Sequence, residues 1–203
     1  MMGGRPGQTQ TTTSTTDEEN ISAKGIKAGV SITIEGGNIN IDSADDSIHT
    51  NDAVTINGGT FTILSGDDGI HADNTLDING GDIAINKSYE GLEATNITIN
   101  EGNVNLTATD DGVNAAGGND SGVGGMFGRD NFDGSSGILT INGGFILVNA
   151  AGDGLDANGS ITMTGGTAIV NGPENNGNGA LDYDGSFDMQ GGTLIAAGST
   201  GMA

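Results

Sequence analysis

The stretch VTINGGTFTILSGDDGIHADNTLDINGGDIAIN, residues 54–86, decides the fold, because its pattern returns after about 22 residues. In both copies a strand with alternating apolar residues is followed by Gly-Gly and then by a second alternating strand. Alternation at every second position predicts short strands with one buried face, and Gly-Gly between them predicts a sharp turn. Because no copy contains a helical segment, the repeat predicts a parallel β-helix rather than a leucine-rich repeat.

The pattern occurs in seven copies, which open on Ile26, Ile48, Ile70, Leu92, Val113, Leu155 and Leu181. These residues should stack into one inward column. Two more columns are predicted from the strands on either side of Gly-Gly: Ile32, Val54, Leu76, Ile97, Leu139, Ile161 and Phe187, and Ile39, Phe61, Ile83, Val104, Ile146, Ala168 and Leu194. We therefore expect an all-β fold, a single-stranded right-handed parallel β-helix of about seven coils of about 22 residues, with one aliphatic core.

The domain organisation follows from the limits of the repeat. Residues 1–20 include a Thr-rich, low-complexity run and are expected to form a flexible N-terminal leader. Residues 21–203 are expected to form the β-helix. A Gly-rich insertion at about 117–137 separates the fifth copy from the sixth and is expected to be a loop.

Charge and composition exclude several classes of partner. The formal net charge is −22, with 5 basic and 27 acidic residues, which argues against nucleic acid and anionic membranes. No apolar stretch approaches the ~18 residues of a membrane span, so direct membrane insertion is not expected. The chain has no cysteine, so neither disulfides nor thiolate metal sites hold the fold.

Acidic residues recur two and three positions before the opening aliphatic of most copies. Stacked strands lie about 4.7–4.9 Å apart, so these carboxylates should face their own copies, and like charges directly opposite destabilise a sheet. Calcium between the rungs would neutralise them, because it binds oxygen ligands at about 2.3–2.6 Å. A solvated acidic edge without metal is the alternative. The predicted calcium ligands are Asp45, Asp46, Asp67, Asp68, Glu90, Asp110, Asp111 and Asp153.

A second set of polar residues follows each opening aliphatic and should point outward. Amides and carboxylates on a flat, rigid face suit the hydroxyl groups of a sugar, directly or through calcium, and a merely hydrated face is the alternative. The predicted carbohydrate-binding residues are His49, His71, Asp73, Glu93, Asn114, Asp156 and Asp182. Leu147, Ile169 and Ile195 occupy an outward row in the last three copies, and we expect this row to be covered.

Several runs resemble a known family: SAKGIKAG, TINGGTFTILSGDDGIHAD, KSYEGLEA, TATDDGVNAAGGND and AAGDGLDANGSITMTGGT, together with the sequence that follows the last of them. They are similar to the bacterial carbohydrate-binding domain family of calcium-binding parallel β-helices, whose members bind cellulose and acidic plant polysaccharides such as polygalacturonate. The resemblance covers nearly everything from Ala23 to Ala203. Members of that family are typically longer than this chain.

The resemblance implies an extracellular or bacterial cell-surface protein that displays calcium on a sugar-binding face. The resemblance also implies that the paired aspartates at 45–46, 67–68 and 110–111 are calcium ligands. Tyr89 and Glu90 depart from the family's acidic motif. We expect Ca²⁺ as the only cofactor, a polysaccharide as the partner and no catalytic residue.

Two other functions remain open at this stage. The fold that the resemblance implies is shared with calcium-dependent polysaccharide lyases, which need a Lys or Arg base. Basic residues in or beside the coils are few: Lys24, Lys27, Lys87 and Arg129. A structural role is the other alternative, because the end strands of a solenoid can pair with a second copy and allow self-association into filaments.

Overall fold

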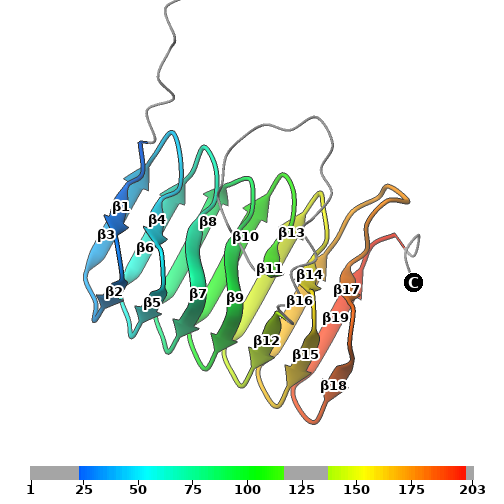
Figure 1. The fold of residues 1–203 in the computed structure, drawn as a ribbon. Coiled ribbons are helices and arrows are strands. Elements are labelled where there is room, and N and C mark those ends of the chain that lie inside the picture. Colours follow the sequence, from blue (N-terminus) through cyan, green and yellow to red (C-terminus); the bar gives the residue numbers. More distant parts are fainter. Residues whose placement is uncertain (1–22, 117–136, 200–203) are drawn as a thin grey trace, which may run out of the picture.

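The computed structural model describes residues 23–116 and 137–199, which form a parallel β-solenoid of about seven turns (Figure 1). The turns stack side by side along one axis, as the repeat predicts. The leader predicted at 1–20 and all but the end of the loop predicted at about 117–137 lie outside these residues. The described part of the chain has no helix, and hence none that could cross a membrane.

The strands form three parallel ladders, one for each strand of a coil. The first contains β1 (Ile26–Ala28), β4 (Ile48–Thr50), the start of β7 (Ile70–Ile78), the start of β9 (Leu92–Ile99), β11 (Val113–Ala115), β14 (Leu155–Ala157) and β17 (Leu181–Tyr183). The second contains β2 (Ser31–Ile34), β5 (Ala53–Ile56), the ends of β7 and β9, β12 (Ile138–Ile141), β15 (Ser160–Met163) and β18 (Phe187–Met189).

The third ladder forms a separate sheet on the other side of the core. It contains β3 (Asn38–Asp42), β6 (Thr60–Leu64), β8 (Asp82–Lys87), β10 (Asn103–Ala108), β13 (Phe145–Ala150), β16 (Thr167–Asn171) and β19 (Thr193–Ala197). In β7 and β9 the first two strands of a coil run on without a break, so the first two ladders belong to one sheet.

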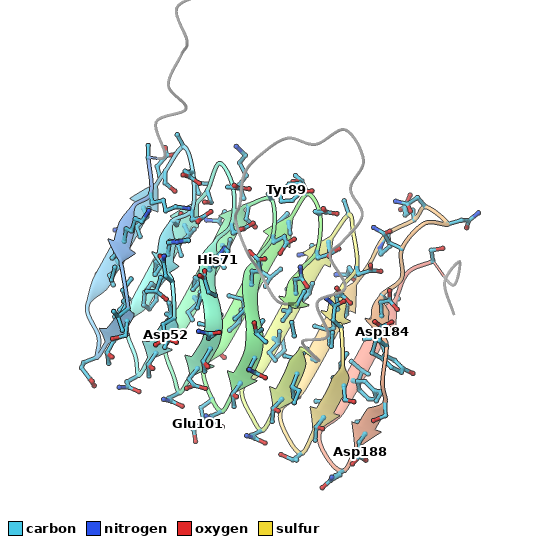
Figure 2. The ribbon with its side chains drawn as sticks, in the orientation of Figure 1. Asp52, His71, Tyr89, Glu101, Asp184 and Asp188 are labelled. Carbon is cyan, nitrogen blue, oxygen red and sulfur yellow. The ribbon has the colours of Figure 1, made fainter. Side chains whose placement is uncertain are left out.

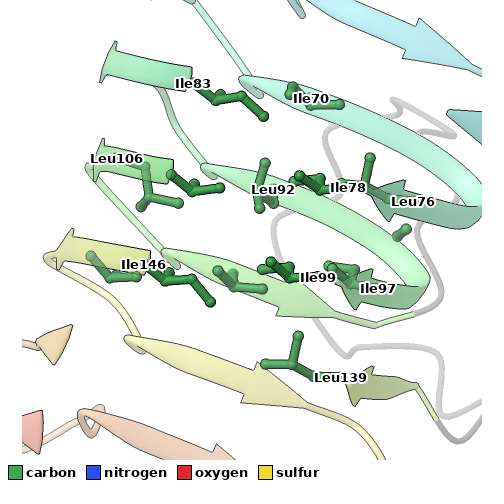
Figure 3. Packing of buried hydrophobic residues seen from close by; sticks show 14 of the residues in the cluster. Ile70, Leu76, Ile78, Ile83, Leu92, Ile97, Ile99, Leu106, Leu139 and Ile146 are labelled. Carbon is green, nitrogen blue, oxygen red and sulfur yellow. The ribbon is translucent and has the colours of Figure 1, made fainter. Parts of the chain in front are cut away.

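The register of the ladders confirms all three inward columns. Ile48 pairs with Ile70, Val54 with Leu76, and Phe61 with Ile83, and the pairing continues along each column. Most members in the middle turns are fully buried and pack into one aliphatic core (Figure 3). Burying one such side chain stabilises the fold by roughly 1.5–3 kcal/mol, so this core is the main source of stability.

The turn between the second and third strands depends on glycine. Within residues 23–116 and 137–199, the second glycine of each Gly-Gly pair has a positive φ, and so does Gly102, where the first glycine of the pair is replaced by Glu101. At Gly144 the φ is 79°, and an added Cβ would lie 2.7 Å from the Gly102 carbonyl oxygen of the preceding turn. Both the backbone conformation and the close approach therefore require glycine.

Asparagine side chains join successive turns beside this corner. Asn79 Nδ2 donates to Asn57 Oδ1 at 2.9 Å, and Asn100 Nδ2 donates to Asn79 Oδ1 at 2.8 Å. The chain of amides continues through Asn142, whose Nδ2 donates to Asn100 at 2.8 Å. These bonds run along the solenoid axis on the solvent side and hold neighbouring turns in register.

The outward aliphatic row is present as predicted. Leu147 pairs with Ile169, and Ile169 with Ile195, in adjacent strands of the third ladder. Leu147 and Ile169 are half-buried, whereas Ile195 is 56% exposed, so no described residue covers the last member of the row.

Candidate functional site

The acidic pairs lie in the turns that lead into the strands of the first ladder. These turns form one edge of the solenoid, which Figure 2 shows at the top with Tyr89, whereas Glu101 and the glycine corners lie at the opposite edge. Backbone hydrogen bonds hold the turns together: Ser47 N donates to Asp68 O at 3.0 Å, and Gly69 N donates to Glu90 O at 2.9 Å. Equivalent acids from successive turns are therefore neighbours, as the spacing predicts.

The second aspartate of each pair is bound by the backbone of the next turn. Asp46 Oδ1 accepts from Asp68 N at 3.2 Å, and Asp68 Oδ1 accepts from Glu90 N at 3.0 Å. Asp111 Oδ1 accepts from Asp153 N at 2.6 Å. The backbone N–H groups therefore supply part of the compensation for these carboxylates.

A lysine adds to this compensation at the N-terminal end. Lys24 Nζ lies 3.4 Å from Asp45 Oδ1 and forms a closer ion pair with Asp46. Carboxylate oxygens of Asp45, Asp46 and Asp67 lie within 4.8 Å of one another, which groups three potential oxygen ligands at this place. The sequence places the lysine in the acidic column but does not show this ion pair.

A second group of carboxylates converges where Gly152 replaces an acid of the column. A Cβ added at Gly152 would lie 2.5 Å from Asp110 Oδ1 and closer still to Asp111 Oδ1. The two carboxylates therefore share the space that a side chain at position 152 would fill. Sequence reasoning missed Gly152, although its position in the acidic column was the available signal.

The acids around Gly152 are held in an environment that favours their protonated form. Burial, with the charges of Asp110, Asp153 and Asp182, raises the pKa of Asp111 to about 7. Burial, with the charges of Asp111, Asp153 and Asp182, raises the pKa of Asp156 to about 7. Burial also raises the pKa of Asp153. A cation bound among these groups would favour the ionised forms instead.

The second predicted row is more buried than expected. His49, His71, Glu93 and Asn114 are at most 9% exposed, so their predicted placement on an open, flat face is wrong. They stack on one another in the first ladder, with the His49 and His71 ring centroids 4.8 Å apart, and this stacking leaves little surface for a sugar. The other three predicted residues, Asp73, Asp156 and Asp182, are partly exposed.

His71 is surrounded by carboxylates on β7, on β9 and in the turn before β7. Its Nδ1 lies 2.8 Å from Glu93 Oε2 and 3.5 Å from Asp68 Oδ2, and its Nε2 lies 3.3 Å from Asp73 Oδ1. His49 has a simpler partner, because its Nδ1 lies 2.8 Å from Asp46 Oδ2. The sequence predicts that these residues are neighbours, but not that the imidazoles are buried.

Glu90 and Glu93 belong to the same coil, Glu90 in the turn before β9 and Glu93 on β9. Burial and the neighbouring charge of Glu93 raise the pKa of Glu90 to about 10, although Asn114 Nδ2 donates to Glu90 Oε2 at 3.0 Å. Burial raises the pKa of Glu93 to about 7, against the opposing effect of His71. Asn114 Oδ1 is buried and has no hydrogen-bond donor among the described residues.

Tyr89 is an exposed aromatic residue within the acidic edge. It is 48% exposed and occupies the position of the first aspartate of a pair (Figure 2). A side-chain hydrogen bond to Asp110 raises the pKa of Tyr89. Its exposed ring beside carboxylates could contact a sugar, a role that sequence reasoning did not assign to it.

Comparison with known families adds a direct finding. The family model described as "Carbohydrate-binding domain-containing protein" matches residues 5–69, 52–91 and 69–199. The chain belongs to this family. No curated protein and no solved structure matches the chain in the corresponding comparisons.

This carbohydrate-binding domain-containing protein has the predicted β-solenoid fold, and its family is described by carbohydrate binding. Membership supports carbohydrate binding in general and points away from catalysis. The lyase alternative also gains little from the basic residues described. Lys24 is engaged with Asp45 and Asp46, and Lys87 is exposed with no ion-pair partner in the described part of the chain.

Proposed function

We propose that the chain is a non-catalytic, calcium-dependent, extracellular binding protein for acidic polysaccharides. The observation that carries the proposal is the convergence of Asp110 and Asp111 on the space beside Gly152, within an acidic edge that spans successive turns. Family membership supports a carbohydrate as the ligand, and the converging carboxylates support a bound cation. Polygalacturonate represents the preferred class of ligand, with cellulose as the neutral comparison.

The residues beside Gly152 fit a calcium ion. Calcium prefers carboxylate and carbonyl oxygens and tolerates irregular geometry. The carboxylates of Asp110 and Asp111 would hold it, with Asp153, Asp156 and Asp182 adding negative charge nearby. None of these five acids has a lysine or arginine partner in the described part of the chain.

A second group, formed by Asp45, Asp46 and Asp67, also offers oxygens, but Lys24 already offsets part of its charge. We therefore propose the first calcium site at Gly152 and a weaker one at Asp45. Glu90 and Asp68 face the histidine cluster, so they are not assigned to either site. Bound calcium would supply positive charge and ligand positions to which a sugar carboxylate can bind.

The exposed groups around the Gly152 site are suited to the rest of the sugar. Tyr89 offers a ring face and lies beside Asp110, whose backbone N–H donates to the Tyr89 carbonyl oxygen at 2.9 Å. Asp156 and Asp182 are partly exposed, so they can reach sugar hydroxyls directly. The buried His49, His71, Glu93 and Asn114 support the surface without touching the ligand.

The net charge makes calcium necessary for an acidic ligand. A protein of net charge −22 repels polygalacturonate at low ionic strength unless a cation lies between them. A neutral glucan has no such requirement. Calcium dependence therefore distinguishes an acidic ligand from cellulose.

The test is retention of purified protein on immobilised polygalacturonate, with calcium and then with a chelator. We expect retention with calcium and release by the chelator. Asp111→Asn should weaken retention, whereas Glu101→Gln, which removes one charge at the opposite edge, should not. Equal retention with chelator contradicts the proposal, and release of unsaturated sugar, read as ultraviolet absorbance, supports a lyase instead.

A further inference from the structure

The cluster around His71 differs in its chemistry from the calcium sites proposed above. It joins two turns, because Asp68 precedes β7, His71 lies on β7 and Glu93 lies on β9. One potential ligand atom from each of the three residues lies within 4.8 Å of the other two. The side chains of His71, Asp68 and Glu93 are 0%, 6% and 11% exposed. The three potential ligand atoms therefore lie at a site that is almost inaccessible to solvent.

The geometry points to a site for a divalent transition-metal ion of the Zn²⁺ class, held by His71 Nδ1 and the carboxylates of Asp68 and Glu93. Imidazole nitrogen with carboxylate oxygen suits zinc and related ions, whereas calcium selects oxygen alone. Ligands of a tetrahedral ion with bonds of about 2.0–2.2 Å lie roughly 3.3–3.6 Å apart. The 3.5 Å between His71 Nδ1 and Asp68 Oδ2 lies within this range, and the 2.8 Å between His71 Nδ1 and Glu93 Oε2 is shorter.

Asp73 supplies an independent observation. Its Oδ1 lies 3.3 Å from His71 Nε2, the ring nitrogen opposite the proposed ligand atom. A metal-bound histidine usually donates its second ring N–H to a carboxylate, which fixes the tautomer and orients the ring. His71 thus has two potential co-ligands near one ring nitrogen and a carboxylate oxygen 3.3 Å from the other.

The charge around His71 also calls for a cation. Asp68, Glu93 and Asp73 surround one imidazole. Neither Asp68 nor Glu93 has a lysine or arginine partner in the described part of the chain. Buried carboxylates are stable as ions only when they are paired or bound to a metal, and a single imidazolium leaves most of this charge unbalanced.

The neighbouring group Asp46, His49 and His71 is a weaker candidate. Asp46 Oδ2 already contacts both His49 Nδ1 and Lys24 Nζ, so a positive charge is in place there. On the other side, Asn114 pairs in register with Glu93 and has a buried Oδ1 with no donor among the described residues. This oxygen is a further candidate ligand beside Glu93. It favours the group of Asp68, His71 and Glu93 over the neighbouring group.

The test uses tag-free, metal-free protein titrated with Zn²⁺ by calorimetry in excess Ca²⁺, with Co²⁺ as a visible-absorption probe. We expect saturable Zn²⁺ binding that calcium does not displace, and Co²⁺ bands typical of low coordination number. Glu93→Gln and Asp73→Asn should each weaken binding by about 10-fold or more. His49→Gln, one rung away, should bind as the native protein does.

The result also separates this inference from the calcium proposal, on which it does not rest. His71→Gln removes the proposed nitrogen ligand and should abolish Zn²⁺ binding. If this variant fails to fold, Asp73→Asn carries the test, because the Asp73 side chain is 27% exposed and lies outside the core. Absence of Zn²⁺ binding in the native protein overturns the inference and leaves an imidazole–carboxylate ion pair. Unchanged binding in Glu93→Gln and Asp73→Asn, or equal loss in His49→Gln, overturns the assignment to these residues.

Discussion

The metal-free protein should lose stability as the pH rises from about 4 to about 7, and Asp111 is the clearest contributor. Its pKa is raised from 3.8 to about 7, chiefly by burial and then by nearby carboxylates. Between these values the folded protein retains a proton that the unfolded chain has lost. Because the folded state binds more protons, the free energy of unfolding falls as the pH rises through this window.

The magnitude follows from the size of the shift. About three pKa units correspond to at most ~4 kcal/mol for Asp111, and screening by solvent at the rim reduces this figure. The slope is about 1.4 kcal/mol per pH unit for each proton of difference between the two states. Since native domains are stable by about 5–15 kcal/mol, the effect is measurable.

The assay is urea unfolding, followed by circular dichroism at several pH values in the presence of a chelator. Asp111→Asn is the matched variant, because the amide keeps an oxygen to accept from Asp153 N but cannot titrate. Between about pH 4 and 7, the free energy of unfolding of this variant should fall less steeply with pH than that of the native protein. The difference in slope should be up to about 1.4 kcal/mol per pH unit, the contribution of one proton. A slope equal to the native one, or stability that rises with pH in the native protein, refutes the reasoning.

Three further predictions concern a glycine, the core and the asparagine row. Gly152→Ala should cost about 1–3 kcal/mol and remove most of the stabilisation by calcium, whereas Gly36→Ala, with open space at its Cβ, should do neither; thermal melts with and without calcium compare them. Leu76→Ala should cost about 2–5 kcal/mol in urea unfolding, because Leu76 is fully buried, and a cost below ~1 kcal/mol would contradict the core described here. Asn79→Ala should cost about 1 kcal/mol more than Asn86→Ala by the same method, because Asn79 bonds to both neighbouring turns. Equal costs would show that the amide row does not stabilise the solenoid.

The fold could be predicted from the sequence because one pattern is repeated and each copy constrains the others. A shift of a single residue would turn the column of Ile48, Ile70 and Leu92 to the wrong face, so the register is strongly specified. The continuous strands β7 and β9 could not be predicted, because the bend between the first two strands of a coil depends on local backbone geometry rather than on periodicity.

The site was predicted only as a set of neighbours. Repetition placed Asp46 beside Asp68, and His49 beside His71, but it carried no information on where each side chain points. Bonds from the next turn's backbone to the aspartates and the burial of His71 both depend on the conformation of the acidic turn. In the sequence Gly152 is only a break in the acidic column, and its role of leaving space for two carboxylates depends on where their side chains point.

Calcium titration into metal-free protein at neutral pH, measured by calorimetry, tests the central claim most directly. The account predicts saturable binding with release of protons, whose tighter phase is lost in Asp111→Asn and Gly152→Ala and retained in Glu101→Gln. Absence of binding heat, or binding that neither Asp111→Asn nor Gly152→Ala weakens, would contradict it.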